Sequence, residues 1–254
     1  MKQNLRAIGA LFALAGLVGC SNSPNAISNL RPDGQIIGGT EATGNEDFAK
    51  TIVALYNVTE GSFCTASILS ETILVTAAHC VGGSPADFRV VFGLDLESKN
   101  IIVRPVEAYQ VSPVWPVRQE QEFNTGDIAI VKFRGGLAPG FTAATLLSDI
   151  NLLKDGQITL LSGYGISDGI TNTGDGRLRF VETTIKQVNF TKTEVLIEQS
   201  KGKGACRGDS GGPAYIEVNG KKLLWGVTSR GVNDPKNDCS VAAAYTSIPF
   251  YAAW

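Results

Sequence analysis

Histidine, methionine and charge are scarce in this chain of 254 residues. His79 is the single histidine, Met1 the single methionine, and charged residues make up 18% of the sequence. Acid–base chemistry that needs an imidazole near neutral pH therefore has one candidate, His79. The net charge of −2 gives no basic excess, so nucleic acid is not an expected partner. The hydrophobic content of 43% excludes disorder for most of the chain and fits a packed globular protein.

The apolar run near the N-terminus is too short for a membrane-spanning helix of the mature protein. It covers 12 residues, 7–18, whereas a helix needs about 20 to cross a bilayer. Lys2 and Arg6 precede it, a pattern typical of a signal peptide. Its end, Leu17 to Cys20, resembles the lipobox of bacterial lipoproteins, in which the cysteine carries the lipid. The alternative is an ordinary signal peptide with a chance cysteine.

The chain has five cysteines, and their number favours disulfides over a metal site. Without a lipidated Cys20, four remain, an even number suited to two disulfides in an exported chain. These four are Cys64, Cys80, Cys206 and Cys239. A zinc site is not expected, because the sequence contains no Cys-x-x-Cys pair and only one imidazole.

Composition divides the chain into three segments. Residues 1–19 are predicted to be the lipoprotein signal peptide. Residues 20–35 are polar and interrupted by prolines, and they are predicted to contain the lipidated cysteine and a propeptide or tether. Residues 36–254 carry the globular domain. Ser21 stands where lipoproteins kept at the inner membrane often have an aspartate. We therefore expect an exported bacterial outer-membrane lipoprotein that becomes periplasmic or extracellular after release.

The globular segment contains many short apolar runs separated by turn residues. Because long helical patterns are missing between them, these runs predict an all-β domain. The clearest runs are 51–58, 73–78, 89–92, 101–106, 128–133, 158–161, 194–197 and 223–228.

Three motifs carry the chemistry of the chain. They are Thr76 to Cys80, Asp127 to Ile130, and Gly208 to Pro213. Each alone is compatible with an ordinary loop or cap. Together, in the order His, Asp, Ser, they resemble the chymotrypsin-like (trypsin-like) serine peptidases, as do Ile36-Ile37-Gly38-Gly39 and Ser162-Gly163-Tyr164-Gly165.

The resemblance covers residues 36–254 and implies a fold and a reaction. The fold is two six-stranded antiparallel Greek-key β-barrels with the active site in the cleft between them, and the boundary near residues 135–145. Ser210 would attack a carbonyl, with His79 as its base and Asp127 orienting the imidazole. The backbone N–H groups of Gly208 and Ser210 would form the oxyanion hole.

The resemblance also implies activation by cleavage before Ile36. The new α-ammonium group would pair with Asp209, whose burial needs an opposite charge. Gln35 precedes the cut, so an activator that cleaves after Arg or Lys is not indicated. Because the cut lies between Cys20 and the domain, the lipid anchors the protein to the membrane only before activation.

Disulfides and a specificity pocket follow from the same template. It pairs Cys64 with Cys80 and Cys206 with Cys239. The pocket residues would be Gly204, Ala205, Ser229, Gly231 and Ala243. Members that cleave after Arg or Lys have an aspartate at the position of Gly204, so an apolar preference is predicted. Two nearby cations, Arg207 and Arg230, are expected either to favour an acidic substrate residue or to be solvated rim charges.

The sequence thus predicts a serine endopeptidase precursor that acts on proteins or peptides. No metal or organic cofactor is expected. The protein is expected to be a monomer. The alternative is a catalytically inactive binding module on the same fold.

Overall fold

The computed structural model describes residues 36–254. The predicted signal peptide, the lipidation site Cys20, the tether and Gln35 lie outside the described residues. Within residues 36–254, the helices are all too short or too polar to cross a membrane.

The first half of the described chain forms a closed antiparallel barrel. Its strands are ordered β2-β3-β4-β7-β6-β5, and β5 closes the barrel by pairing with β2. The strands are β2 (Ile52–Asn57), β3 (Ser62–Ile68), β4 (Ile73–Thr76), β5 (Phe88–Phe92), β6 (Ile102–Val111) and β7 (Ala129–Phe133).

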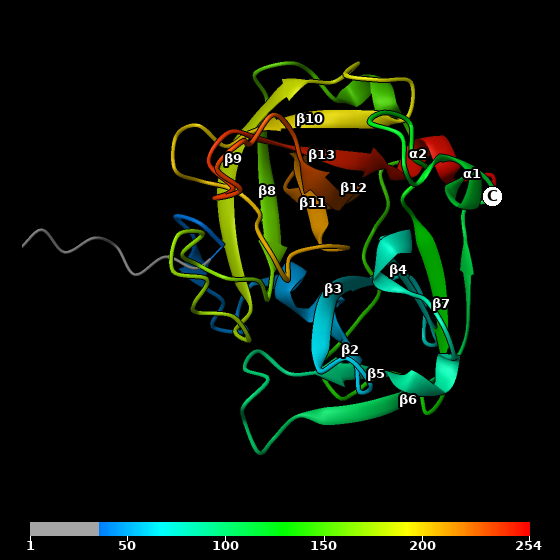
Figure 1. The fold of residues 1–254 in the computed structure, drawn as a ribbon. Helices are drawn as coiled ribbons and strands as arrows, with labels where there is room; N and C mark the ends of the chain where they lie inside the picture. Colours follow the sequence, from blue (N-terminus) through cyan, green and yellow to red (C-terminus); the bar gives the residue numbers. More distant parts are fainter. Residues whose placement is uncertain (1–35) are drawn as a thin grey trace, which may run out of the picture. The chain divides into compact units, whose positions relative to one another are not determined.

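The second half forms another antiparallel barrel beside the first (Figure 1). The sheet order is β1-β9-β10-β13-β12-β11-β8, and pairing of β8 with β9 closes six of these strands into a barrel. The strands are β1 (Thr40–Glu41), β8 (Ile158–Gly163), β9 (Arg179–Gln187), β10 (Glu194–Glu198), β11 (Pro213–Val218), β12 (Lys221–Gly231) and β13 (Ala242–Ser247). Helices are short: η1 (Asp47–Thr51), η2 (Ala78–Cys80), η3 (Pro85–Asp87), α1 (Trp115–Arg118), η4 (Ile150–Leu152) and α2 (Ile248–Tyr251).

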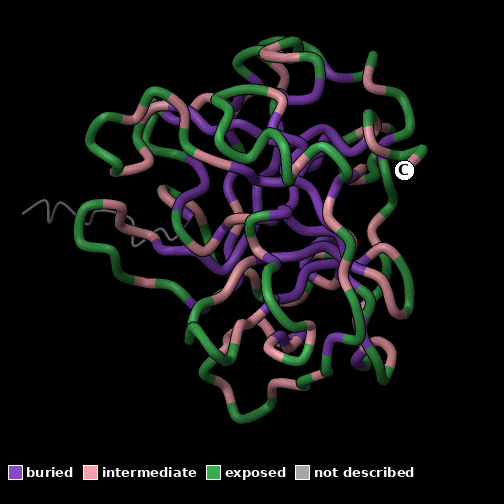
Figure 2. Tube along the Cα trace, turned by 45° about the vertical axis from the view of Figure 1, so that its right-hand side comes forward, coloured by how far each residue is buried: buried purple, intermediate pink, exposed green. Residues whose placement is uncertain are grey.

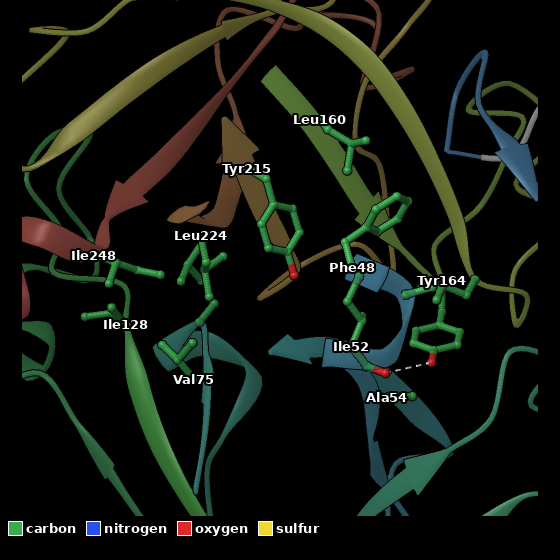
Figure 3. Close-up of a cluster of buried hydrophobic side chains, with 14 of the residues drawn as sticks. Phe48, Ile52, Ala54, Val75, Ile128, Leu160, Tyr164, Tyr215, Leu224 and Ile248 are labelled. Carbon is green, nitrogen blue, oxygen red and sulfur yellow. Dashed lines mark hydrogen bonds between the residues drawn. The ribbon is translucent and has the colours of Figure 1, made fainter. Parts of the chain in front are cut away.

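Alternation along the strands produces three apolar clusters. In β2, Val53 and Leu55 point into the first barrel, whereas Ile52 and Ala54 belong to a cluster shared by both barrels. Successive side chains of a strand point to opposite faces, so one strand supplies both clusters. The shared cluster also contains Tyr215 of β11 (Figure 3). Buried stretches accordingly run through the strands, while the loops are mostly exposed (Figure 2).

The two-barrel prediction is confirmed. Each of the eight apolar runs named from the sequence overlaps a strand. The predicted boundary, 135–145, falls in the connection between β7 and β8. Of the predicted site residues, His79, Asp127 and Ser210 lie in connections between strands, whereas Ser229, Gly231 and Ala243 lie in β12 and β13.

Candidate active site

His79 and Asp127 meet because their strands are neighbours in the first barrel. Thr76, the last residue of β4, pairs with Ala129, the first residue of β7. The residues just after β4 and just before β7 therefore lie at the same end of the barrel. His79 Nδ1 is 2.8 Å from Asp127 Oδ2, and the His79 backbone N–H donates to Asp127 Oδ1 at 3.0 Å.

The second barrel also holds Asp127. The Ser229 hydroxyl of β12 donates to Asp127 Oδ2 at 2.6 Å, and the Thr246 hydroxyl of β13 donates to the Asp127 carbonyl at 2.9 Å. The Asp127 carboxylate is thus buried, at 2% exposure, with donors from both barrels. The sequence analysis placed Ser229 in the pocket but missed this contact, because strand register across the barrels cannot be read from spacing.

The neighbourhood of His79 favours its protonated form. Burial lowers the pKa of His79, but the hydrogen bond from its ring to Asp127 and the charge of that carboxylate raise it, and the net shift is upward. An imidazole held in this way is oriented by Nδ1 and leaves Nε2 free to exchange a proton with a nearby hydroxyl.

Ser210 lies in the tight turn before β11, next to glycines. Gly208 has φ of 89°, a left-handed conformation that favours glycine, and a Cβ there would lie 2.8 Å from Gly165 Cα. Thr65 of β3 fixes the turn, because its N–H donates to the Ser210 carbonyl at 2.8 Å and its hydroxyl to the Gly208 carbonyl at 2.9 Å. Among the residues described, the N–H groups of Gly208 and Ser210 have no protein acceptor. Both remain available to an oxyanion.

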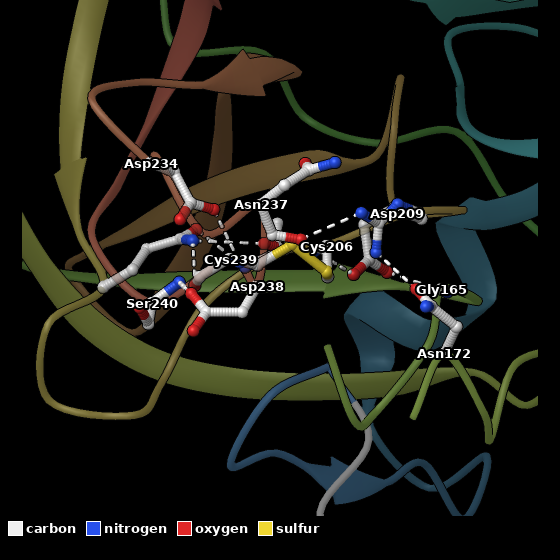
Figure 4. The surroundings of a disulfide bond; sticks show 12 residues. Gly165, Asn172, Cys206, Asp209, Asp234, Asn237, Asp238, Cys239 and Ser240 are labelled. Carbon is white, nitrogen blue, oxygen red and sulfur yellow. Dashed lines mark hydrogen bonds between the residues drawn. A yellow bond between two sulfur atoms is a disulfide. The ribbon is translucent and has the colours of Figure 1, made fainter. Parts of the chain in front are cut away.

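The carboxylate of Asp209 is enclosed by residues of the second half of the chain. Its carboxylate is completely buried and accepts hydrogen bonds from the N–H groups of Gly165, at 2.9 Å, and Cys206, at 2.8 Å (Figure 4). Burial raises the pKa of Asp209 to about 7, although these two bonds and the charge of Arg179 act against the rise. Gly163 and Gly165 leave room for this carboxylate, since a Cβ at either would approach it to 2.3–2.5 Å.

The segment that begins at Ile36 packs beside the chain that leads to the Ser210 turn. Ile36 is buried in the cluster inside the second barrel, together with Ala205. The N–H of Gly204 donates to the Ile37 carbonyl at 3.0 Å. Ile36 has φ of 44°, which is strongly disfavoured for a β-branched residue. Cleavage before Ile36 would remove that constraint, because φ is defined only by a preceding peptide bond.

A cavity of about 230 Å³ adjoins Ser210. Its lining includes four of the five residues predicted for the specificity pocket: Ala205, Ser229, Gly231 and Ala243. The fifth, Gly204, does not line this cavity, and its place in the specificity pocket stays a prediction. The side chain of Gln199 occupies the space where a Cβ at position 204 would be, at 2.3–2.5 Å.

Gln199 ties the walls of this cavity together. Its Nε2 donates to the carbonyls of Ala205 and Cys239, at 3.2 and 2.8 Å, and its Oε1 accepts from the Ala205 N–H at 2.9 Å. Sequence reasoning missed Gln199, although it lies only five residues before Gly204, because nothing in the spacing shows that its amide folds back.

The loop between β12 and β13 adds a carboxylate to the lining. Asp234 Oδ2 accepts from the Cys239 N–H at 2.7 Å (Figure 4), while its buried Oδ1 has no hydrogen-bond partner within the described part of the chain. Arg207, also in the lining, donates to Asn172 Oδ1 and to the Asn237 carbonyl.

Both predicted cysteine pairings are present. Cys64 is bonded to Cys80 across 16 residues, and Cys206 to Cys239 across 33. The first disulfide lies next to His79, so these three residues are close enough to resemble a metal-ligand set. Disulfide sulfurs are not thiolates, and this group therefore lacks the ligands that zinc requires.

Comparison with known proteins agrees with this geometry. Residues 36–254 match the family model described as trypsin. The chain is 27% identical to fibrinolytic enzyme isozyme C of Lumbricus rubellus, over 86% of this chain and 98% of that protein. It is 27% identical to a chymotrypsin of Phaedon cochleariae, over 75% of this chain and 70% of that protein. It is 25% identical to trypsin epsilon of Drosophila erecta, over 96% of each chain. These relatives come from animals and do not bear on the predicted bacterial lipoprotein signal. The chain belongs to the trypsin family of serine peptidases.

Proposed function

We propose that this protein is a serine endopeptidase that cleaves proteins or peptides through an acyl-enzyme at Ser210. One observation carries the proposal: the buried carboxylate of Asp127 is bound by His79 of one barrel and by Ser229 of the other, and Ser229 lines the same cavity as Ser210. A histidine held by a buried carboxylate next to a serine is the arrangement that activates a hydroxyl nucleophile.

Each step of the reaction has a residue to perform it. Ser210 Oγ attacks the substrate carbonyl carbon, and its proton passes to His79. The N–H groups of Gly208 and Ser210 stabilise the oxyanion, and the intermediate expels the amine, which takes the proton from His79. Water, deprotonated by His79, then hydrolyses the ester. Asp127 keeps the imidazole in the required tautomer and stabilises its charged form.

Activation by cleavage before Ile36 is the second part of the proposal. The docked Ile36 segment and the strained φ at this residue support it, as does the buried Asp209, which has no bonded cation among residues 36–254. The cut creates an ammonium group, and its pairing with Asp209 orders the turn that carries the oxyanion donors.

The third part of the proposal is export of the precursor and its release from the membrane. Lipidation at Cys20 would hold the precursor at a membrane, and the cut would free the enzyme. A soluble active species that begins at Ile36 is the expected product. Recovery of active enzyme only with the lipidated cysteine attached would contradict release.

The pocket supports the predicted preference for apolar side chains over Arg or Lys. Ala205, Gly231 and Ala243 give it small walls. Asp234, by contrast, would attract a cation, so the preference has to be measured with and without this carboxylate.

Covalent labelling tests the catalytic proposal. A fluorophosphonate should label Ser210 strongly after cleavage before Ile36 and weakly before it, with Ser210→Ala as the control. Peptide mapping identifies the labelled residue. Correctly processed protein that is folded but unlabelled would reject the enzyme and favour the inactive binding module.

A further inference from the structure

Arg230 follows Ser229 in β12, and a buried carboxylate holds its guanidinium. Nη1 lies 2.9 Å from Glu194 Oε1, and Nη2 lies 3.1 Å from Glu194 Oε2. Nη2 also donates to the carbonyl of Glu122. The Glu194 side chain is 0% exposed and that of Arg230 27%. A guanidinium engaged on both arms is neither a solvated rim charge nor free for an acidic substrate residue, the two roles that the sequence left open.

Glu194 also holds the chain that leads to Asp127. The N–H groups of Asn124 and Thr125 donate to its carboxylate at 3.1 and 3.2 Å, and the Thr125 hydroxyl at 3.3 Å. Burial raises the pKa of Glu194, but the bond and charge of Arg230 and the two N–H donors lower it, and the net shift is downward. Glu194 is therefore ionised at neutral pH.

Two routes connect this ion pair with Asp127. Along the backbone, only Gly126 separates Thr125 from Asp127, so fixing Thr125 limits where the carboxylate can lie. Through side chains, Arg230 Nη1 lies 3.4 Å from Ser229 Oγ, the hydroxyl that donates to Asp127 Oδ2. The pair thus holds both the segment before Asp127 and a hydroxyl bound to it.

We propose that Glu194 and Arg230 are positioning residues for the reaction. They fix the Asp127 carboxylate, which orients His79, through these contacts, and Arg230 also lines the cavity beside Ser210. The inference rests on the proposed endopeptidase function. A misplacement of about 1 Å at a reacting group costs about 100-fold in rate. We therefore expect Glu194→Gln and Arg230→Met to lower kcat by about 10- to 100-fold, with a smaller change in KM.

The pH profile separates positioning from a direct effect of charge. The acid limb of kcat/KM reports the pKa of His79 in the free enzyme. By charge alone, losing the Glu194 anion lowers this pKa and losing the Arg230 cation raises it. Loss of positioning weakens the contact with Asp127 that raises the pKa of His79. This pKa then falls in both variants, and the acid limb moves to lower pH. A downward shift in Arg230→Met is the decisive result.

The measurements use processed enzyme normalised by active-site titration, so that unfolded molecules do not count. Glu217→Gln, which breaks the exposed 2.6 Å pair with Lys222 on the same hairpin, is the matched control and should leave kcat and the acid limb unchanged. Arg230→Lys keeps the charge but loses the two-armed contact, and its kcat should fall between wild type and Arg230→Met. If Arg230→Met or Glu194→Gln does not fold, Arg230→Lys provides the test. A reduced kcat and an acid limb shifted to lower pH in this variant would support the positioning role.

Wild-type kcat and an unmoved acid limb in the Arg230 variants would overturn the inference, even with a lowered melting temperature, because the pair would then only stabilise the fold. An upward shift in Arg230→Met would overturn it in favour of direct electrostatics. Failure of processed wild-type protein to react with a fluorophosphonate would instead reject the proposed function itself.

Discussion

Cleavage before Ile36 should stabilise the fold near neutral pH, and Asp209 sets the size of the effect. In the uncut chain burial raises the pKa of Asp209 from 3.8 to about 7. The folded state then binds more protons than the unfolded state between these values, so stability falls as the pH rises through this range. A difference of about three pKa units corresponds to about 4 kcal/mol.

After cleavage, the Ile36 ammonium group can pair with Asp209 and lower the pKa of this carboxyl again. The cut form should therefore gain at most about 4 kcal/mol over the uncut form at pH 7, and little at pH 4, where Asp209 is protonated in the uncut fold. The free α-amino pKa is about 8, and pairing raises it. The gain should disappear as the pH rises through that raised value.

Urea unfolding with the disulfides intact measures this difference. With a slope of about 1–3 kcal/mol per molar urea, a gain of about 4 kcal/mol moves the midpoint by more than about 1 M. Asp209→Asn should abolish the pH-dependent difference between the forms. Equal midpoints for cut and uncut wild type at pH 7, or a difference that persists in Asp209→Asn, would refute the reasoning.

Three further predictions concern the site itself. Asp127→Asn should lower kcat by about 10⁴-fold and move the acid limb to lower pH, because the contact that raises the pKa of His79 is lost; a rate profile against pH checks both. Gly208→Ala should lower kcat by at least about 100-fold, since an alanine resists φ of 89° and displaces an oxyanion donor; titrated enzyme that keeps wild-type kcat would contradict this. A library of peptide substrates should show apolar residues before the cleaved bond. Cleavage after Lys or Arg in the wild type, lost in Asp234→Asn, would contradict this and show that the Asp234 carboxylate determines specificity.

The fold was predictable because the apolar runs alternate with turns and the motifs are specific. Strands outside the runs named in the sequence analysis, such as β9 and β13, are less distinct. β9 mixes Arg, Glu and Lys with its buried residues, and β13 opens with three alanines. Their place in the barrel comes from register with neighbours, which a single sequence does not contain.

The site was predictable to the extent that its residues lie in motifs. His79 and Asp127 meet as the resemblance implied, and both disulfides pair as expected. Gln199 and Glu194 carry no motif, and each acquires its role only when a loop folds against it. The role of Arg230 could not be decided from the sequence for the same reason, because its partner is 36 residues away in the chain.

Each disulfide of residues 36–254 closes a loop within one barrel. Alignment of His79 and Asp127 with Ser210 therefore depends on non-covalent contacts: the shared apolar cluster, the hydroxyl contact from Ser229 to Asp127, and the charged contacts of Glu194 and Arg177 with the first half of the chain. Gentle warming should let the two halves slip relative to each other before either one melts. Catalysis would then fade reversibly at temperatures where circular dichroism still reports intact sheets.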